Sequence, residues 1–307
     1  MKLKSLCGRR CGACSLIGVI LLVVNLNGTS RAGDRPVVEF NIVVQEKTIE
    51  LLGNPKKVAT VWAFGLEGQE ATVPGPVIRV KKGARVRIHF KNTHVLPHSM
   101  HFHGVHPYKM DGNGVRKLGT EQLQMPGESY TYEWTPAEPG YYLYHCHFDT
   151  LNHMDHGMYG LFIVEDPAWP AVDQEILTMW DEWDIDGDGR YDTHTINTRS
   201  APDQKPLTAK VGEKVRLVMA NVGSDVHTPH MHGVMWEAID SRDLRTRLLN
   251  DANGVISLAP AQLKVVEFVT PDPGTWLFHC HVLPHVADDG LYERGMLTTL
   301  NVIREQS

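Results

Sequence analysis

The sequence predicts an all-β protein built from two β-sandwich domains in tandem. One segment is repeated: KKGARVRIHFKN from Lys81 aligns with KVGEKVRLVMAN from Lys210 at an offset of about 129 residues. Segments such as 129–134 (SYTYEW) and 263–269 (LKVVEFV) alternate polar with apolar or β-branched residues, as half-buried strands do. Turns containing Gly and Pro separate these segments, and helical periodicity is almost absent.

The N-terminal residues 1–32 differ from the rest and are expected to be a signal peptide. A basic stretch that ends at Arg10 precedes the apolar run Leu16–Val24, and Ala32 closes a small-x-Ala cleavage site. The apolar run is too short for a normal membrane span, so we expect an exported protein, periplasmic or extracellular, without a stable span. Both the general secretory and the twin-arginine route are compatible with this segment.

A segment rich in proline and acidic residues marks the boundary between the two domains. The segment EDPAWPAVDQE, residues 165–175, interrupts the apolar pattern with two prolines and several acidic residues. We therefore place the first domain at 34–166 and the second at 172–307.

The formal net charge is −6 and no basic stripe occurs, so a nucleic-acid partner is not expected.

Only two cysteines remain once the signal peptide is removed. Of the five in the sequence, Cys146 and Cys280 lie outside residues 1–32, and each stands between two histidines, in YHCHFD and FHCHVL. A disulfide between them would consume two matched sites at once. Metal ligation explains the pair better.

Each domain carries H-x-x-H-x-H-G and, some 40 residues later, H-C-H followed by another histidine. On a strand, residues i and i+2 face the same way and the residue between them faces the opposite way. The cysteine of each H-C-H triplet is therefore expected to face away from its two neighbours. One strand can then supply ligands to two different metal sites.

On the cysteine side, a thiolate, two imidazoles and a distant thioether form the trigonal blue-copper electron-transfer site. The interval from His285 to Met296 is longer than that from His153 to Met158, so Met296 is the less direct assignment. The expected ligand sets are His98, Cys146, His153 and Met158 in the first domain, and His227, Cys280, His285 and Met296 in the second.

On the opposite side, four H-x-H pairs supply eight histidines, more than one metal ion needs. A cluster of imidazoles suits copper. Zinc is the weaker alternative, because thioether and paired blue-site ligands add little for zinc. The eight are His101, His103, His145, His147, His230, His232, His279 and His281.

These motifs resemble those of the multicopper oxidases. The organisation in two domains resembles the small, laccase-like branch of that family, whose members have two Greek-key cupredoxin domains. The resemblance implies that a reducing substrate such as a phenol or aromatic amine donates electrons at type 1 (blue) copper. A trinuclear copper cluster then reduces dioxygen to water with four electrons. His101 and His230 would hold type 2 copper, and the other six cluster histidines would hold the type 3 pair.

The resemblance also bears on assembly and on the number of blue sites. It implies a homotrimer in which each cluster lies between the first domain of one chain and the second domain of the next. Members of the family commonly have one blue site, whereas this sequence carries both ligand sets. Two points of electron entry per cluster follow if both are filled.

Reduction of dioxygen also needs protons. Related oxidases have an acidic proton relay after the first H-x-H-G, which makes Asp111 the candidate catalytic residue, whereas Asp240 is expected to be an echo of the duplication. Tyr108 is expected to be a buried tyrosine, with a redox-active role near the cluster as the alternative. Histidines outside the pattern are expected to be ordinary residues, with His156 the one to watch as a competing ligand: His89, His94, His106, His156 and His194.

Two other functions use similar parts. Copper nitrite reductases also have two cupredoxin domains, but they use a mononuclear catalytic copper and an Asp-containing motif where this chain has His101-x-His103. A non-catalytic copper carrier or electron-transfer protein would need only the blue sites. Separately, DIDGDG from Asp184 resembles the start of a calcium loop, but its twelfth position is Thr195 instead of Glu, which favours a solvated acidic turn.

Overall fold

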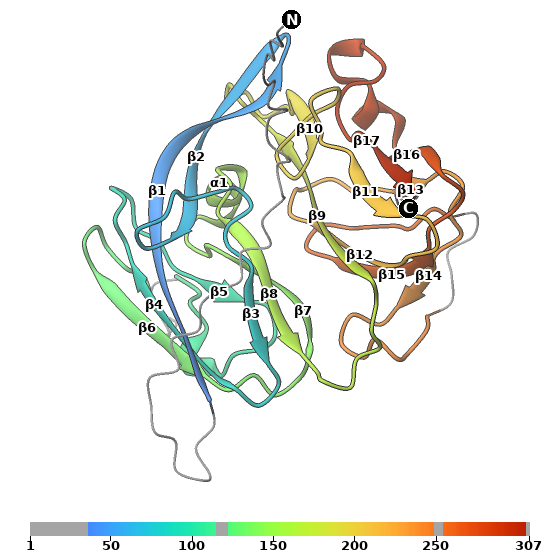
Figure 1. Ribbon diagram of the computed structural model, residues 1–307. Coiled ribbons are helices and arrows are strands. Elements are labelled where there is room, and N and C mark those ends of the chain that lie inside the picture. Colours follow the sequence, from blue (N-terminus) through green and yellow to red (C-terminus); the bar gives the residue numbers. More distant parts are fainter. Residues whose placement is uncertain (1–35, 115–121, 249–253, 305–307) are drawn as a thin grey trace, which may run out of the picture. The chain divides into compact units, whose positions relative to one another are not determined.

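The structure of the protein is a computed structural model that describes residues 36–114, 122–248 and 254–304. Its strands form four sheets, which make up two β-sandwiches (Figure 1). The predicted all-β fold with two sandwiches in tandem is therefore confirmed. The expected signal peptide, residues 1–32, lies outside the described part of the chain.

The first sandwich pairs the sheet β2-β1-β4-β6 with the sheet β3-β8-β7-β5. Its elements are β1 (Val37–Gly53), β2 (Lys56–Leu66), β3 (Ile78–Lys81), β4 (Arg85–Lys91), β5 (His101–Phe102), η1 (Tyr108–Met110), β6 (Ser129–Trp134), β7 (Gly140–His145), α1 (Thr150–Asp155) and β8 (Tyr159–Glu165).

The second sandwich pairs the sheet β10-β9-β12-β15-β14 with the sheet β11-β17-β16-β13. Its elements are β9 (Gln174–Trp183), β10 (Thr193–Ile196), β11 (Leu207–Lys210), β12 (Lys214–Asn221), β13 (Pro229–Met231), β14 (Glu237–Ile239), β15 (Leu263–Val269), β16 (Gly274–Cys280), η3 (Leu283–Val286), η4 (Asp288–Gly290) and β17 (Leu297–Ile303).

Alternation along the strands places one face of each sheet in an apolar interior. In β4, Val86, Ile88 and Phe90 are fully buried, whereas Arg87 faces outward and donates a hydrogen bond to Glu133. Each such buried side chain contributes about 1.5–3 kcal/mol. A further buried cluster contains residues of both sandwiches, and the limits 34–166 and 172–307 stay predictions.

The duplication seen in the sequence recurs in the strand pairing. β1 runs parallel to β4, as β9 runs parallel to β12. In the same way β5 pairs with β7, which sets His101 opposite His145, and β13 pairs with β16, which sets His230 opposite His279. The sheet register therefore brings the H-x-x-H-x-H-G and H-C-H motifs of each half together.

No helix among the described residues is long and apolar enough to cross a membrane.

Candidate metal centres

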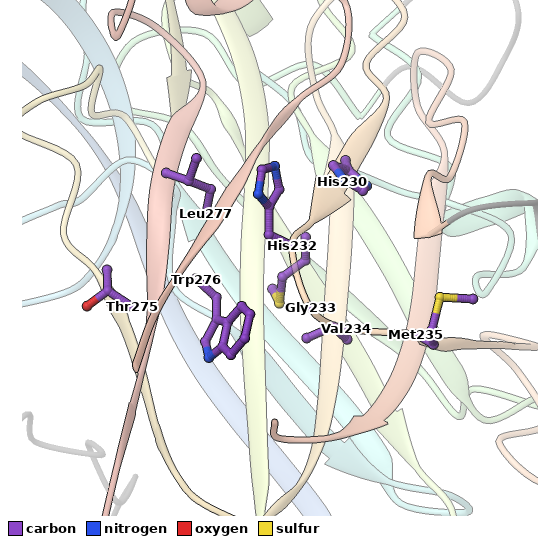
Figure 2. A pocket seen from close by; sticks show the side chains of 9 residues that line it. His230, His232, Gly233, Val234, Met235, Thr275, Trp276 and Leu277 are labelled. Carbon is purple, nitrogen blue, oxygen red and sulfur yellow. The ribbon is translucent and has the colours of Figure 1, made fainter. Parts of the chain in front are cut away.

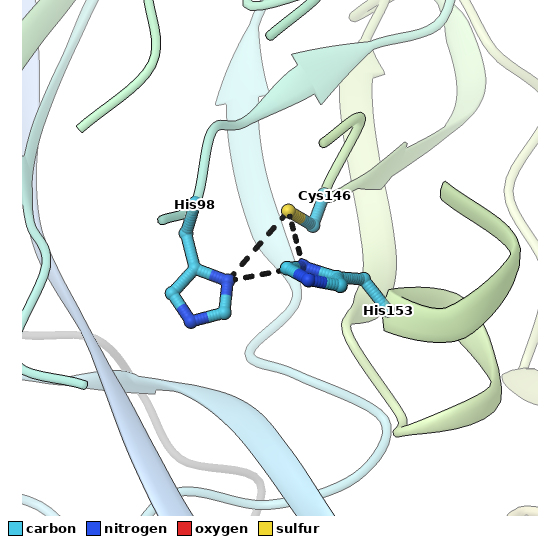
Figure 3. Close-up of side chains that lie close together, drawn as sticks. All are labelled: His98, Cys146 and His153. Atoms are coloured by element: carbon cyan, nitrogen blue, oxygen red, sulfur yellow. Dashed lines mark hydrogen bonds between the residues drawn. The ribbon is translucent and has the colours of Figure 1, made fainter. Parts of the chain in front are cut away.

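Three predicted ligands of the first blue site converge in the interior of the first sandwich. The Sγ atom of Cys146, just after β7, lies 3.1 Å from Nδ1 of His153 and 3.8 Å from Nδ1 of His98 (Figure 3). The two Nδ1 atoms are 3.2 Å apart. All three side chains are buried, and His153 is presented by α1.

The second sandwich repeats this arrangement. Nδ1 of His285, on η3, lies 3.6 Å from Sγ of Cys280 and 3.2 Å from Nδ1 of His227. The ligand atoms of all three residues lie within 4.8 Å of one another, and all three are buried. Cys146 and Cys280 are both free thiols, as metal ligation requires.

The two methionines occupy equivalent backbone positions despite their different spacing in the sequence. The backbone amide of Cys146 donates to the carbonyl of Met158, and that of Cys280 donates to the carbonyl of Met296, both at 3.0 Å. Both methionine side chains are fully buried in the same clusters as their cysteines. The residues between His285 and Met296 form η4 and a turn, which absorb the extra length.

A glycine precedes each methionine where the chain turns. Gly157 and Gly295 have φ values of +81° and +78°, a conformation that costs other L-residues about 1–2 kcal/mol. A Cβ atom at Gly295 would also lie 2.1 Å from the carbonyl oxygen of His285. A glycine at this point therefore lets Met296 follow His285 back toward Cys280.

The two cysteine sites differ in their electrostatics. Burial raises the pKa of the Cys146 thiol to about 11, and burial together with His153 and His94 lowers the pKa of His98 to about 3. Burial opposes ionisation of Cys280 as well, but contacts with His227 and His285 outweigh it and lower the pKa of Cys280 to about 5.

The imidazole of His227 explains part of this difference. Burial alone would lower its pKa, but contacts with Cys280 and Glu182 raise it to about 9. Nε2 of His227 and Oε2 of Glu182 lie 3.1 Å apart in a fully buried pair. Neither atom has another hydrogen-bond partner among the described residues.

On the other side of β7, the four histidines of the first sandwich form a group. Nε2 of His103 and Nε2 of His145 lie 2.9 Å apart, and the ring of His101 lies 5.0–5.4 Å from those of the other three. Nδ1 of His145 donates to the carbonyl of its neighbour Cys146, so Nε2 carries the lone pair. His101 and His147 likewise direct Nδ1 to the carbonyls of Asp111 and Asn113.

The second sandwich holds the matching group. Nε2 of His232 lies 3.3 Å from Nε2 of His279, and the ring of His230 lies 5.5 Å from those of His279 and His281. His230 and His232 also line a pocket of about 740 Å³ together with Trp276 (Figure 2). No hydrogen bond or ring contact between described residues joins this group of four to the group in the first sandwich.

The histidine groups and cysteine sites fit a metal such as copper. Burial lowers the pKa of His103 to about 4 and that of His145 to about 3, so both imidazoles are neutral at neutral pH and can bind a metal ion. The Nε2 lone pair of His145 faces Nε2 of His103 at 2.9 Å, a spacing at which a proton or a cation can lie between the two nitrogens. Carbonyl acceptors on the opposite ring nitrogens are the usual support of metal-bound histidine.

Asp111, the predicted proton relay, lies beside the first histidine group. Its Oδ1 atom is 3.3 Å from Nδ1 of His101 and 3.5 Å from Nε2 of His106. By contrast, Oδ1 of Asp240 accepts the backbone amides of Arg242 and Asp243 within its own turn. The expectation that Tyr108 is buried is wrong, because its side chain is 69% exposed.

Three histidines that the sequence places outside the ligand pattern lie near the ligands, as does Glu182, which the sequence did not single out. His94 lies 2.8 Å from His98, and the ring of His194 stacks on His285 at 4.3 Å. His156 stacks on Trp62 at 3.9 Å instead of joining the ligand group. Position in the repeat could have flagged His94, whereas the long separation of Glu182 from His227 left no local signal.

The acidic segment after β9 forms a turn held by its own carboxylates. Asp184 accepts the backbone amides of Gly187, Asp188 and Gly189. Asp192 accepts the amide of Ile185. These bonds are those of the solvated acidic turn that the sequence favours.

Comparison with known proteins agrees with the geometry. A family profile described as multicopper oxidase matches residues 44–168, and a second profile of the same description matches residues 178–296. The blue copper oxidase of Nitrosomonas europaea has a similar structure, with a TM-score of 0.76 and 27% identity, over 86% of this chain and 85% of that one.

Curated relatives share the sequence over most of this chain but are much longer. A probable nitrite reductase–hydroxylamine oxidoreductase fusion protein of Kuenenia stuttgartiensis is 30% identical over 269 residues, which are 80% of this chain and 30% of the relative. Ceruloplasmin of Rattus norvegicus is 27% identical over 277 residues, 76% of this chain and 24% of the relative. The two matched profiles together cover most of the chain, which therefore belongs to the multicopper oxidase family as a small, two-domain member.

Proposed function

We propose that the protein couples one-electron oxidation of a reducing substrate, a phenol or aromatic amine, at type 1 copper to four-electron reduction of dioxygen to water at a trinuclear copper cluster. One observation carries this proposal. At the ends of β7 and β16 a cysteine reaches one ligand group, whereas the histidine before it reaches another. Each strand end would therefore link two kinds of metal centre by a single peptide.

Copper bound in these sites would accept and release single electrons. In each half the cysteine, its two histidines and its methionine would hold type 1 copper. His101 and His230 would hold type 2 copper, because each is the first histidine of its H-x-H-G motif. The type 3 pair would be held by His103, His145, His147, His232, His279 and His281.

Protons for the reaction would come through the side of the first histidine group that Asp111 borders. The Asp111 carboxylate lies within 3.5 Å of both His101 and His106, so a proton on this carboxyl is next to a ligand of the proposed type 2 copper. Asp111 would hold and release that proton, which makes it the proposed catalytic residue. Asp240 has no comparable position in the second half.

The separation of the two histidine groups supports a homotrimer. Each group offers four imidazoles, and within one chain the described residues make no contact from one group to the other. A ring in which the first half of one chain meets the second half of the next would join the groups three times by the same interface. Export to the periplasm or the extracellular space, after loss of residues 1–32, completes the proposal.

Copper counting and oxygen uptake test this function against nitrite reduction, which the name of the Kuenenia relative raises. Copper-loaded protein is expected to hold about three non-blue copper ions per chain and to consume oxygen with phenols or aromatic amines. One non-blue copper per chain with nitrite reduction would favour a nitrite reductase. Blue copper alone, without uptake of oxygen by any donor, would favour a carrier.

A further inference from the structure

The two proposed blue sites differ in what contacts one ring nitrogen. This nitrogen is Nε2 of His98 in the first site and Nε2 of His227 in the second, and it faces away from the cysteine. His98 and His227 each direct Nδ1 toward the other histidine of their site. Nε2 of His98 lies 2.8 Å from Nδ1 of His94, a neighbouring imidazole. Nε2 of His227 lies 3.1 Å from Oε2 of Glu182, a carboxylate.

The carboxylate has a counterpart in the first sandwich. Val43 of β1 pairs with Lys91 of β4, and Met179 of β9 pairs with Ala220 of β12 at the same point of the duplicated fold. Three residues after Val43 comes Glu46, and three residues after Met179 comes Glu182. Both halves therefore place a glutamate at the same point of the same strand.

The two halves differ at one position on the neighbouring segment. Three residues after Lys91 comes His94, and three residues after Ala220 comes Gly223. His94 stands between the glutamate and the ligand: its Nε2 lies 3.3 Å from Oε2 of Glu46, whose side chain is 57% exposed.

Gly223 leaves that space to the carboxylate. A Cβ atom at Gly223 would lie 2.2 Å from Oε2 of Glu182. With no side chain there, Glu182 is fully buried against His227, and its Oε1 accepts the backbone amides of Ser224 and Asp225. Two amide donors on a buried carboxylate stabilise its anionic form.

We propose that the exchange of His94 for Gly223 gives the two blue sites unequal reduction potentials, the site of Cys280 being the lower. The proposal rests on the proposed function only in requiring blue copper in both halves. A buried anion beside a ligand stabilises the oxidised ion, which carries one more positive charge than the reduced ion. Glu46 acts from solvent and only through the intervening ring of His94, so its effect on His98 is screened.

A second carboxylate reinforces the difference. Oδ2 of Asp225, half-exposed, lies 3.8 Å from Nε2 of His285, the other histidine of the second site. In the first site, Nε2 of His98 faces away from Cys146, and among the described residues it has the His94 imidazole as its one contact at hydrogen-bond distance. Exchange of one electron between the sites makes and breaks no bond, and at equilibrium the electron should favour the first site by tenfold or more.

Anaerobic redox titration of single-site variants tests the proposal. In the full-length, copper-loaded chain, C146S leaves only the second blue site and C280S leaves only the first. The blue band of C146S should titrate at the lower potential, by about 59 mV or more, which is tenfold for one electron. Equal potentials, the reverse order, or a variant that binds copper without a blue band would overturn the proposal.

Three further substitutions separate charge from shape. In the C146S background, Glu182→Gln should raise the reduction potential of the second site, which corresponds to a tenfold or larger increase in the equilibrium constant for reduction. In the C280S background, Glu46→Gln should change the same constant of the first site by less than about threefold. Gly223→His should also raise the reduction potential of the second site, because the new side chain would displace the Glu182 carboxylate. No shift with Glu182→Gln, in protein that keeps its blue band, contradicts the assignment.

These measurements do not depend on oxygen. If both blue bands form and titrate in the expected order but no donor supports oxygen uptake, the proposed oxidase function fails and the inequality of the sites stands. If oxygen uptake is found but the potentials are equal, the proposed function stands and the role of Glu182 fails.

Discussion

Cys146 and His145 are adjacent in the sequence, yet their side chains belong to different ligand groups. Sγ of Cys146 lies 3.1 Å from Nδ1 of His153, whereas Nε2 of His145 lies 2.9 Å from Nε2 of His103. Alternation at the end of a β-strand is sufficient to produce this division. The same relationship holds between Cys280 and His279 in the second half.

Removing a ligand on the histidine side should stop oxygen reduction without removing blue copper. His103→Ala is expected to lower oxygen uptake by more than about 100-fold, since even changes behind the ligands cost 10–100-fold. The blue absorption band should survive, because Cys146 faces the other way. His89→Ala is the matched control: His89 contacts Thr131 on the outer face of the sheet, and uptake should be unchanged. Loss of the blue band in His103→Ala would contradict the division of ligands.

Replacing either methionine should tune a blue site without destroying it. Met296→Leu is expected to raise the reduction potential of the second site by about 59 mV or more, because the oxidised ion loses a thioether donor. Met158→Leu should act in the same way on the first site. Met179→Leu, a substitution in a buried cluster without a cysteine, is the control and should leave both potentials unchanged. Redox titration that found no shift for Met296→Leu would remove it from the ligand set.

The turn before Met296 should be less tolerant than a similar turn nearby. Gly290 and Gly295 both have positive φ, but a Cβ atom meets nothing within 4 Å at Gly290 and lies 2.1 Å from the His285 carbonyl at Gly295. Gly290→Ala is expected to cost about 1–2 kcal/mol of conformational strain. Gly295→Ala should cost more and weaken the second blue band. Urea unfolding and the absorption of C146S protein measure both effects, and equal costs would argue against the close turn.

The copper-free protein should lose stability in acid. Burial lowers the pKa of His98 and His145 to about 3 and that of His103 and His153 to about 4, against about 6.5 in the unfolded chain. Below pH 6.5 the unfolded chain binds more protons at these sites than the folded chain. Their contribution is therefore complete above about pH 6.5 and is lost as the pH falls toward 3–4. Urea unfolding at several pH values should show this decline.

The carboxyl of Asp155 opposes this trend, as does that of the buried Asp181, and Asp155 supplies a control. Burial, together with the nearby charges of Glu182 and Asp184, raises the pKa of Asp155 to about 6. Asp155 therefore stabilises the folded chain less as the pH rises from about 4 to 6. Asp155→Asn should remove this opposing effect and make the acid loss steeper. A copper-free protein that gained stability between pH 6.5 and 4 would contradict the assignment of neutral, buried histidines.

Much of the fold could be predicted because it depends on local alternation and on duplication. The segments 129–134 and 263–269 were expected as strands and form β6 and β15 with the same limits. The ligand motifs were also visible, since their spacing follows strand geometry. The structure brings together the cysteine and two histidines of each half, and separately the paired histidines of each half. Their occupation by metal stays a prediction.

Other features depend on contacts that sequence spacing does not encode. Glu182 meets His227 because β9 and β12 are neighbours in a sheet, although the residues are 45 positions apart. The position of Met296 depends on the turn that follows His285. In the sequence, the longer interval between these two residues argued against Met296 as a ligand. Tyr108 was expected inside because aromatic residues are often buried, but it lies on the exposed η1.

Diffraction from crystals of the copper-loaded protein, recorded on both sides of the copper absorption edge, tests the division of ligands most directly. Anomalous peaks are expected beside the sulfurs of Cys146 and Cys280, with a separate group of peaks among the H-x-H histidines of two adjoining chains. Peaks confined to the cysteine sites, or a sulfur and its flanking imidazoles bound to one common ion, would contradict it.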